Sequence, residues 1–380
     1  MSYPLVCLGD VADFINGVAF KPEDWGTEGK PIIRIQNLND PLKEYNYTER
    51  EVKDTNIARK GDLLVSWSAS LGVYEWTGQD ACINQHIFKV VPNNEKIDKT
   101  YLKRALELSI VEMESQVHGA TMKHITRGKF LANQIPLPPL AEQRRIASIL
   151  DQADELRQKR QQAIEKLDQL LQATFIDMFG DPVSNPKGWN LGRLGDVIHS
   201  AKDGPHVSPS YSETGIPFLS TRHVRAGKIV WGDLKFITEE DAQIHWKKCK
   251  PTRGDILYTK GGTTGLAAVV DTDLDFAVWV HVALLKTNHD KVRSEWLVSM
   301  LNTQYCYEQS QRYTHGIANR DLGLKRMVNI EMYIPPLDEQ DKFVNFKNKL
   351  LKNNLLFESS YSSLEQLFKS LQNQAFNGTL

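Results

Sequence analysis

The sequence predicts an α+β protein with two similar globular domains, each followed by a long helix. The two helices are expected to pack as an antiparallel coiled-coil-like spine with pseudo-two-fold symmetry. Three observations predict this fold class. The phrase PPLAEQ at 138–143 returns as PPLDEQ at 335–340, a long amphipathic segment follows each copy, and short β-type runs alternate with turn residues before each copy.

The duplication extends over the whole chain. LGDVADFINGV at 8–18 corresponds to LGDVIHSAKDG at 194–204, and KGDLLVSWSASLG at 60–72 corresponds to RGDILYTKGGTTG at 253–265. The offset grows from 186 to 193, reaches 197 at the prolines and then stays constant. Because insertions accumulate in loops, each half is predicted to be a variable globular domain followed by a helix of fixed length. The predicted boundaries are 1–140 and 184–332 for the globular domains, and 141–183 and 333–380 for the helical regions.

Each tail predicts one long helix. Residues 142–179 contain no proline or glycine, apolar residues recur at steps of three and four, and Gly180 and Pro182 are stop signals. About 38 residues correspond to about 57 Å of helix. A single stripe of this kind is most often an ordinary core helix, but two copies in identical register favour mutual packing about a pseudo-two-fold axis. An alternative is that these helices also leave surface for a partner's helices, since their flanks are partly apolar.

The globular halves are expected to be α+β domains built on a curved sheet. Their β-type runs are IIRIQN (32–37), DLLVSW (62–67), HIFKVV (86–91), DILYTK (255–260) and FAVWVHVALLK (276–286). A helical segment precedes the proline phrase in each half, at 99–108 and at 294–303.

Composition excludes several classes of protein. The 46 Lys and Arg residues balance 47 Asp and Glu residues, so the chain lacks the strong basic excess of many nucleic-acid binders. The four cysteines are far apart and suggest a reduced, cytoplasmic protein without a structural metal. No secretory leader or membrane-spanning stretch is evident.

The sequence contains almost no recognisable catalytic apparatus. It lacks a P-loop, a G-x-G-x-x-G fingerprint, an H-E-x-x-H pair and a G-x-S-x-G elbow. If the protein takes part in a reaction, another chain is expected to perform the chemistry.

Binding chemistry is concentrated in loops that occur in both halves. HGATMKHITRGKF and HGIANRDLGLKRM precede the two proline phrases, SWSASLG and TKGGTTG follow corresponding strands, and RIQNLND corresponds to FLSTRHV. Arg and Lys pair with phosphate or guanine, and Asn pairs with adenine, so these loops are candidates for DNA binding. The alternative is a set of loops that merely expose charge. The candidate residues are Arg34, Asn37, Ser68, Lys123, His124, Arg127, Arg222, His223, Lys260, Thr263, Asn319, Arg320 and Lys325.

This pattern resembles the specificity subunit of type I restriction-modification systems over nearly the whole chain. The motifs that carry the resemblance are LGDVADFINGVAF, KGDLLVSWSASLG, the run from His118 to Leu150, and the helix ending in FGDP. The second half matches less tightly, since Asp338 and Phe343 replace Ala141 and Ile146 of the first.

The resemblance implies a non-catalytic subunit with two target-recognition domains, each of which reads one half of a bipartite site in double-stranded DNA. The paired helices would set the spacer and dock two modification (methyltransferase) subunits, and restriction subunits would complete the complex. The chain itself would hold no cofactor, while S-adenosylmethionine, ATP and Mg would be bound by the partner subunits.

A competing hypothesis is a scaffold in which two protein-binding modules are joined by long helices and never touch DNA. A steep salt dependence of DNA binding would separate the two hypotheses. An enzyme with an unrecognised active site is the third possibility.

Overall fold

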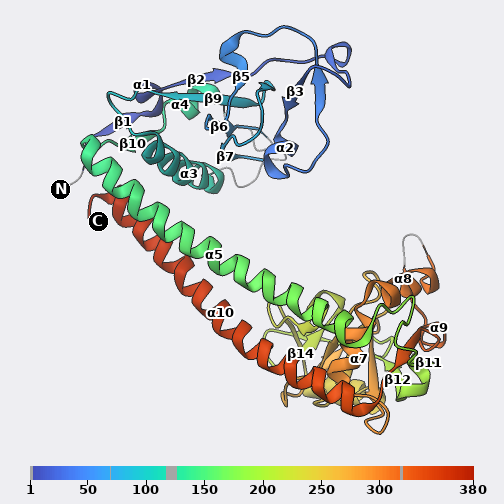
Figure 1. Ribbon diagram of the computed structural model, residues 1–380. Coiled ribbons are helices and arrows are strands. Elements are labelled where there is room, and N and C mark those ends of the chain that lie inside the picture. The colour runs from blue at the N-terminus through green and yellow to red at the C-terminus, as the bar shows by residue number, and fades with distance from the viewer. Residues whose placement is uncertain (1–2, 69, 117–125, 317–319) are drawn as a thin grey trace. The chain divides into compact units, whose positions relative to one another are not determined.

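The computed structural model describes residues 3–68, 70–116, 126–316 and 320–380 (Figure 1). The chain divides into two compact units, one of residues 1–162 and 358–380, the other of residues 163–357. Each long helix contributes to both units, because its sequence crosses the boundary between them. Both units are α+β and repeat one arrangement of elements, so the predicted fold class is confirmed.

The first unit contains two four-stranded sheets instead of the single curved sheet that the sequence predicts. One has the order β2-β9-β6-β7 and is antiparallel, and the other has the order β4-β3-β8-β5 and pairs β3 with β8 in parallel. On β6, Leu63 and Val65 enter one apolar cluster while Leu64 enters another. A strand buried on both faces has no polar alternation, which is why its sequence reads as a continuous apolar run.

The strands and helices of this unit are as follows. The strands are β1 Leu5–Cys7, β2 Ala12–Asn16, β3 Lys30–Ile33, β4 Asn46–Thr48, β5 Ile57–Ala58, β6 Leu63–Ser66, β7 Gly72–Glu75, β8 Ala81–Ile83, β9 Ile87–Pro92 and β10 Gln134–Pro136. The helices are α1 Leu8–Val11, α2 Ile35–Asn39, α3 Lys99–Gln116 and α4 Arg127–Leu131, with short 3₁₀ turns η1 Pro22–Asp24 and η2 Asp54–Asn56. Strands β1 and β10 form a separate antiparallel ribbon.

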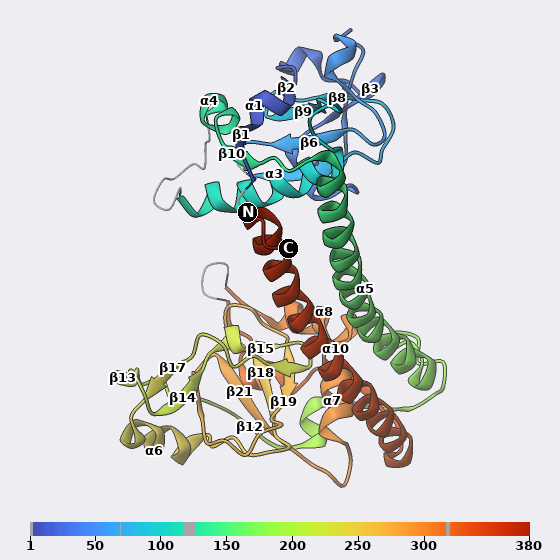
Figure 2. The same ribbon diagram turned by 90° about the vertical axis from the view of Figure 1, so that its left-hand side faces the viewer.

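The second unit repeats the first sheet in the order β12-β21-β18-β19 (Figure 2). Its other sheet, β13-β17-β14-β20, repeats the strands β4-β3-β8 as β17-β14-β20, with β14 parallel to β20, but its fourth strand, β13, pairs with β17, whereas β5 of the first unit pairs with β8. The run at 276–286, expected as one strand, forms β20 in one sheet and β21 in the other. Its additional length includes a ten-residue helix, α6, and a two-stranded ribbon, β15 with β16.

Its strands are β11 Asn190–Arg193, β12 Ile198–Asp203, β13 Tyr211–Ser212, β14 Ile216–Leu219, β15 Val224–Arg225, β16 Lys228–Ile229, β17 Lys235–Ile237, β18 Ile256–Thr259, β19 Ala267–Val269, β20 Ala277–Val278, β21 Val282–Thr287 and β22 Glu331–Ile334. Its helices are η3 Leu194–Val197, η4 Thr221–His223, α6 Glu239–Lys248, α7 Ser294–Leu301, α8 Gln304–Tyr313 and α9 Leu324–Met327. Strands β11 and β22 form the counterpart of the β1–β10 ribbon.

The long helices are α5, Leu140–Phe179, and α10, Leu337–Asn377, with 40 and 41 residues. Helix α5 stops where the sequence predicts. Gly180 donates its N–H to Ile176 O at 2.7 Å and has a φ of +83°, a conformation that favours glycine.

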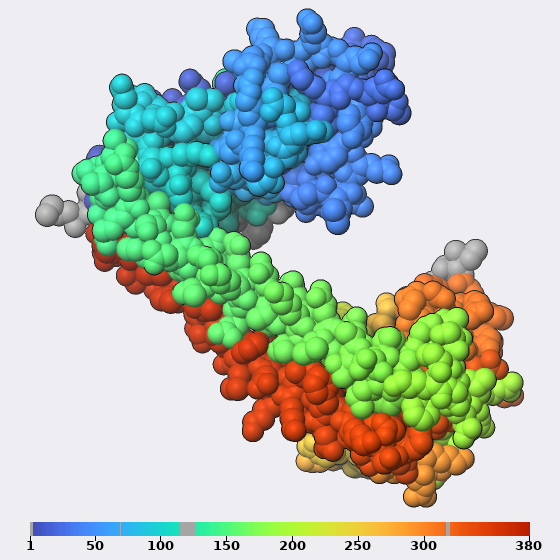
Figure 3. Space-filling view, in the orientation of Figure 1, coloured from blue at the N-terminus to red at the C-terminus, as the bar shows by residue number. Residues whose placement is uncertain are grey.

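Helices α5 and α10 pack against each other within each unit, and Figure 3 shows α5 in green against α10 in red. In the first unit, Arg157 near the middle of α5 pairs with Glu365 of α10 at 2.6 Å and lies over the ring of Phe368. In the second unit, Phe175 and Phe179 of α5 contact Phe343 near the start of α10, with ring centroids 5.3 and 5.6 Å apart. The early half of each helix thus meets the late half of the other, and the pair is antiparallel.

A buried glutamine fixes the start of each long helix. Gln143 accepts the Asp98 N–H at 2.7 Å and donates to Lys96 O at 3.0 Å and to Pro138 O at 2.8 Å. Gln340, 197 positions later, accepts the Arg293 N–H and donates to the carbonyl oxygens of Lys291 and Pro335 in the same way. Both side chains are fully buried. These glutamines are the last residues of PPLAEQ and PPLDEQ, so the repeated phrase encodes a joint between each helix and its globular domain.

Lys347 of α10 is a buried cation, and no carboxylate of the described residues lies at ion-pair distance from it. Only 6% of the residue is exposed, and its ammonium donates to Glu295 O at 3.2 Å and Ser299 Oγ at 3.0 Å. Burial lowers its pKa to about 8 from the ordinary 10.5. The corresponding residue of α5 is Leu150, which is fully buried.

We expect Gln143→Ala and Gln340→Ala each to lower the free energy of unfolding by about 2–3 kcal/mol, because each leaves a buried N–H and two carbonyl oxygens without the amide that paired them. Urea denaturation of the full chain measures the loss. The matched control is Gln152→Ala on the exposed face of α5, for which a change within about 0.5 kcal/mol is expected. If the Gln143→Ala and Gln152→Ala variants were equally stable, the hydrogen bonds of Gln143 would not stabilise the start of the helix as proposed.

Replacement of Lys347 by leucine, the residue of the first half, should stabilise the chain by roughly 1–2 kcal/mol at pH 7. Between a folded-state pKa of about 8 and the ordinary 10.5, the unfolded chain binds more protons, so wild-type stability rises with pH in this window. The leucine variant lacks that rise. Denaturation at pH 7, 8.5 and 10 tests both effects, with Lys349→Leu at an exposed position of α10 as the control. A parallel pH profile for wild type and Lys347→Leu would refute the assignment.

Candidate nucleic-acid interface

Two loops of the second unit, predicted separately from the sequence, lie side by side. One follows β18 (260–266), and the other follows α8 (314–322, of which 317–319 lie outside the described residues). Backbone hydrogen bonds join them, from Gly262 N to Arg320 O at 3.0 Å and from Leu322 N to Lys260 O at 2.6 Å. The structure therefore brings Thr263 and Arg320 onto one surface, and both residues are exposed.

The loop after β18 depends on glycine. Gly265 has a φ of +95°, and a Cβ there would lie 2.3 Å from Ser310 Oγ. Behind it, Thr264 Oγ1 hydrogen-bonds Thr314 Oγ1 at 3.0 Å, and Gln311 donates to Thr264 O at 3.1 Å. The Oε1 atom of Gln311 also accepts a hydrogen bond from the Arg320 guanidinium. The loop is held by its base and presents its tip, Gly262 and Thr263, to solvent.

Lys260 stands at the base of this loop and is buried. Its ammonium lies 3.3 Å from Asp203 Oδ2 and 3.1 Å from Asp321 Oδ1. The Lys260 charge is thus neutralised inside the protein, and its proposed contact with DNA stays a prediction that this geometry does not favour.

Asn37 and His223 occupy corresponding positions, and each caps a short helix. Asn37 Oδ1 accepts the Arg34 N–H at 3.1 Å, and His223 Nδ1 accepts the Ser220 N–H at 2.8 Å. Both residues are buried, and burial lowers the pKa of His223. The stretch at 32–37, expected to be a strand throughout, leaves β3 after Ile33 and turns into α2. Their side chains serve the local backbone, so base contacts by these two residues would require a rearrangement.

Arg34 and Arg222 are more accessible but have internal partners. Arg34 lies over the Trp25 ring at 5.2 Å and donates to Asn46 Oδ1 at 3.3 Å. Arg222 pairs with Asp233 at 3.2 Å and also donates to its carbonyl oxygen. Lys325 is exposed on α9, and Ser68 is half-buried in the loop after β6.

Arg127 begins α4 and is exposed, with one guanidinium nitrogen donating to Phe14 O at 3.1 Å. Three further candidates, Lys123, His124 and Asn319, lie outside the described residues. The contact between the two loops is therefore described only for the second unit.

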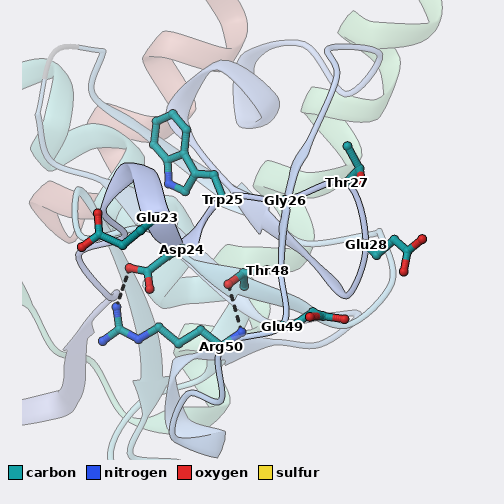
Figure 4. Close-up of a pocket in the computed structure, with 9 residues that line it drawn as sticks. All are labelled: Glu23, Asp24, Trp25, Gly26, Thr27, Glu28, Thr48, Glu49 and Arg50. Carbon is teal, nitrogen blue, oxygen red and sulfur yellow. Dashed lines mark hydrogen bonds and ion pairs between the residues drawn. The ribbon is translucent and has the colours of Figure 1, made fainter.

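A cavity of about 440 Å³ in the first unit lies beside Trp25 (Figure 4). Its rim carries Glu23, Glu28 and Glu49, and its one arginine, Arg50, pairs with Asp24 at 2.9 Å. The Lys21 backbone N–H and the Arg50 guanidinium hold the pKa of Asp24 below its usual value. An acidic rim repels phosphate, so this cavity is a poor place for the DNA backbone.

Two cations that sequence reasoning did not select face each other on the β15–β16 ribbon. Arg225 is directly opposite Lys228, both are exposed, and the turn between them is tied to β19 by a 2.8 Å bond from Gly227 N to Ala267 O. Like charges in cross-strand register repel, and an anion between them relieves the repulsion. Both cations belong to a basic stretch of the sequence, STRHVRAGK at 220–228, and the ribbon places them opposite each other.

The described residues contain no cluster of three or more His, Cys, Asp or Glu side chains suited to a metal ion. Within the same part of the chain, no helix is both long and apolar enough to cross a membrane. The four cysteines are free.

Comparisons with known proteins agree with the duplicated architecture. A family model described as the type I restriction modification DNA specificity domain matches residues 3–166 and again residues 186–366. The chain is 22% identical over 413 residues to the type I restriction enzyme EcoBI specificity subunit of Escherichia coli, covering 100% of this chain and 86% of that protein. It is 24% identical over 391 residues to the MjaVIII specificity subunit of Methanocaldococcus jannaschii, covering 97% and 90%.

Solved structures with the same fold extend over nearly the full length of the chain. The S subunit of a type I restriction-modification system from M. genitalium aligns with a TM-score of 0.60 at 16% identity, covering 99% of this chain and 96% of that one. A chain from a structure that describes complex assembly of a type I R-M system aligns with a TM-score of 0.56 at 18% identity, covering 100% and 98%.

Proposed function

The chain belongs to the family of type I restriction-modification DNA specificity proteins, and we propose that each of its two units reads one half of a bipartite DNA site. The observation that carries this proposal is the joined pair of loops in the second unit, with Thr263 and Arg320 exposed on one surface. Arginine and threonine are suited to base edges and phosphates. Arg225 and Lys228 of the nearby ribbon would contribute contacts to the DNA backbone.

The first unit would use the corresponding loops, with Arg127 and Ser68 among the described residues, and with Lys123 and His124 beyond them. Sequence differences between the two sets of loops would give the two half-sites different base preferences. Two domains of the same fold with different loops would therefore recognise an asymmetric DNA site.

The paired helices would hold the two units at a set separation along the DNA. Forty residues of helix extend about 60 Å, which exceeds one turn of B-DNA at about 34 Å. This length supports two readers placed in different major-groove segments, with an unspecified spacer between their half-sites.

The same helices would dock two copies of a modification subunit. Leu170 of α5 and Leu367 of α10 correspond in the duplication, and they are 46% and 49% exposed. A repeated apolar surface on each helix suits two copies of one partner. Methyl transfer with S-adenosylmethionine, and ATP- and Mg-dependent translocation and cleavage, would take place on the modification and restriction subunits.

Arg127→Ala and Arg320→Ala should each weaken binding to the cognate site by about tenfold, since a good arginine contact to DNA contributes roughly 1–3 kcal/mol. Fluorescence anisotropy on the complex with modification subunits measures affinity, and the melting temperature checks folding. Arg253→Ala removes an exposed arginine that pairs with Asp273 and serves as the control for charge. Wild-type affinity in both arginine variants would refute this site assignment, and a flat salt dependence of wild-type binding would favour the scaffold.

Adding four residues, about one turn and 6 Å, to both α5 and α10 near their midpoints should lengthen the tolerated spacer by about one or two base pairs. The half-site sequences should not change, because the loops that would read them are untouched. Sequencing of methylated adenines in cells that express the complete system reports both quantities. The control is the same insertion in the exposed loop at 206–208. An unchanged spacer in a helix variant that still methylates DNA would exclude the ruler role.

A further inference from the structure

Lys260 connects three segments of the second unit that are distant in sequence. Its ammonium lies between Asp203, the last residue of β12, and Asp321, in the loop after α8, and it is 3.5 Å from Val280 O before β21. Only 7% of the Lys260 side chain is exposed. A lysine ammonium has three donors, and three oxygens surround this one, so no donor is left for a phosphate.

The two carboxylates differ in what holds them. Asp203 is buried and also pairs with Lys248 of α6 at 2.6 Å. Burial opposes its ionisation, but Lys248 and Lys260 more than offset this, and the pKa of Asp203 lies below its usual value. Asp321 is half-exposed, and its second oxygen is 3.7 Å from the Arg326 guanidinium. Asp203 therefore anchors Lys260 to the sheet, while Asp321 connects it to the outer loop.

The position of Asp321 fixes the position of Arg320, because the two residues are adjacent in the chain. Its backbone exchanges hydrogen bonds with His315 at 2.8 and 3.0 Å, and the preceding residue, Arg320, accepts the Gly262 N–H. The Lys260–Asp321 ion pair thus spans the base of the same two loops that carry Thr263 and Arg320. Moving Asp321 would shift Arg320 relative to Thr263.

The first unit holds its corresponding loop by different means. Trp67 replaces Lys260, with the same backbone bond to the histidine across the sheet: Trp67 N to His86 O at 3.3 Å, and Lys260 N to His281 O at 2.9 Å. The Trp67 ring stacks on Phe88 with centroids 5.5 Å apart. An aromatic contact in the first unit and an ion pair in the second therefore hold the loop at corresponding positions of the two domains.

We infer that Lys260 is a positioning residue of the second unit, and that base discrimination at the second half-site depends on its ion pair with Asp321. Lys260 acts through Arg320 and Thr263 and does not touch DNA. Reading of the first half-site is independent of this pair. The inference rests on the proposed function and assigns one determinant of specificity within it.

Asp321→Asn is the variant of choice, because Asp203 and Val280 O still satisfy the buried Lys260 and the fold is kept. In the complex with modification subunits, the preference for the cognate second half over a scrambled second half should fall about five- to tenfold, as expected for a coupling between neighbouring residues. The preference for the first half should not change. Loss of one negative charge by itself would strengthen binding to cognate and scrambled DNA alike. The expected effect is instead a smaller difference in affinity between the two DNAs, so it cannot be caused by the change in charge.

Three comparisons make the test specific. Asp273→Asn makes the same charge change at an exposed ion pair of the same unit and should leave discrimination intact. Asp321→Glu keeps the carboxylate and should restore part of the preference. In an Arg320→Ala background, Asp321→Asn should add less than about twofold, because residues that act through one another are not additive.

Each result has one meaning. If Arg320→Ala alters discrimination at the second half-site and Asp321→Asn does not, the positioning role is wrong and the proposed function stands. Additive effects of the two substitutions, or equal losses at both half-sites, would also overturn the role. If the wild-type complex shows no preference for a bipartite site, the proposed function fails first and the inference fails with it.

Discussion

The buried glutamine at the start of each long helix is the constraint on which the architecture depends. A glutamine side chain both accepts and donates, so one neutral group satisfies an N–H and two carbonyl oxygens in a fully buried place. A charged glutamate could not donate to those carbonyls. The prolines complete the joint, since Pro139 O accepts the first helical N–H groups, from Glu142 and Gln143. The direction in which each helix leaves its domain is therefore set by hydrogen bonds of fixed geometry.

The same frame carries different side chains in its two copies. In the first unit, Arg104 of α3 reaches Asp151 and Asp154 of α5 at 2.7 and 3.0 Å. In the second, the corresponding residue is Ser299, and the cation is Lys347 on α10. The cation thus lies on the globular domain in the first unit and on the long helix in the second. If the two helix segments were interchanged, Arg104 would face Lys347, and the two aspartates would face Ser299, so buried charges would be left unpaired. The loops have diverged in the same manner, because the joint and the sheets hold the backbone whatever the loop side chains are.

Residue type alone was a poor guide to the interface. Asn37 and His223 have the chemistry of base readers, yet each occupies the third position of a short turn and caps it. Lys260 has the chemistry of a phosphate binder, yet two carboxylates and a carbonyl surround it. Thr263 and Arg320 were selected by the same reasoning and lie exposed on one surface. The difference among these residues is whether the side chain is buried and already used by the protein itself as a hydrogen-bond or ion-pair partner.

The duplication, the two long helices, the end of the first helix at Gly180 and the absence of familiar catalytic motifs can be predicted from the sequence, because periodicity, stop signals and repeated phrases are local properties of the chain. Only the tertiary structure decided that each globular part has two sheets, since strands buried on both faces, such as β6 and β18, have no alternation to reveal their partners. It also decided that Lys260 pairs internally with Asp203 and Asp321. Those partners lie 57 and 61 positions away, and the competition between internal and external contacts is settled by folding, not by residue type.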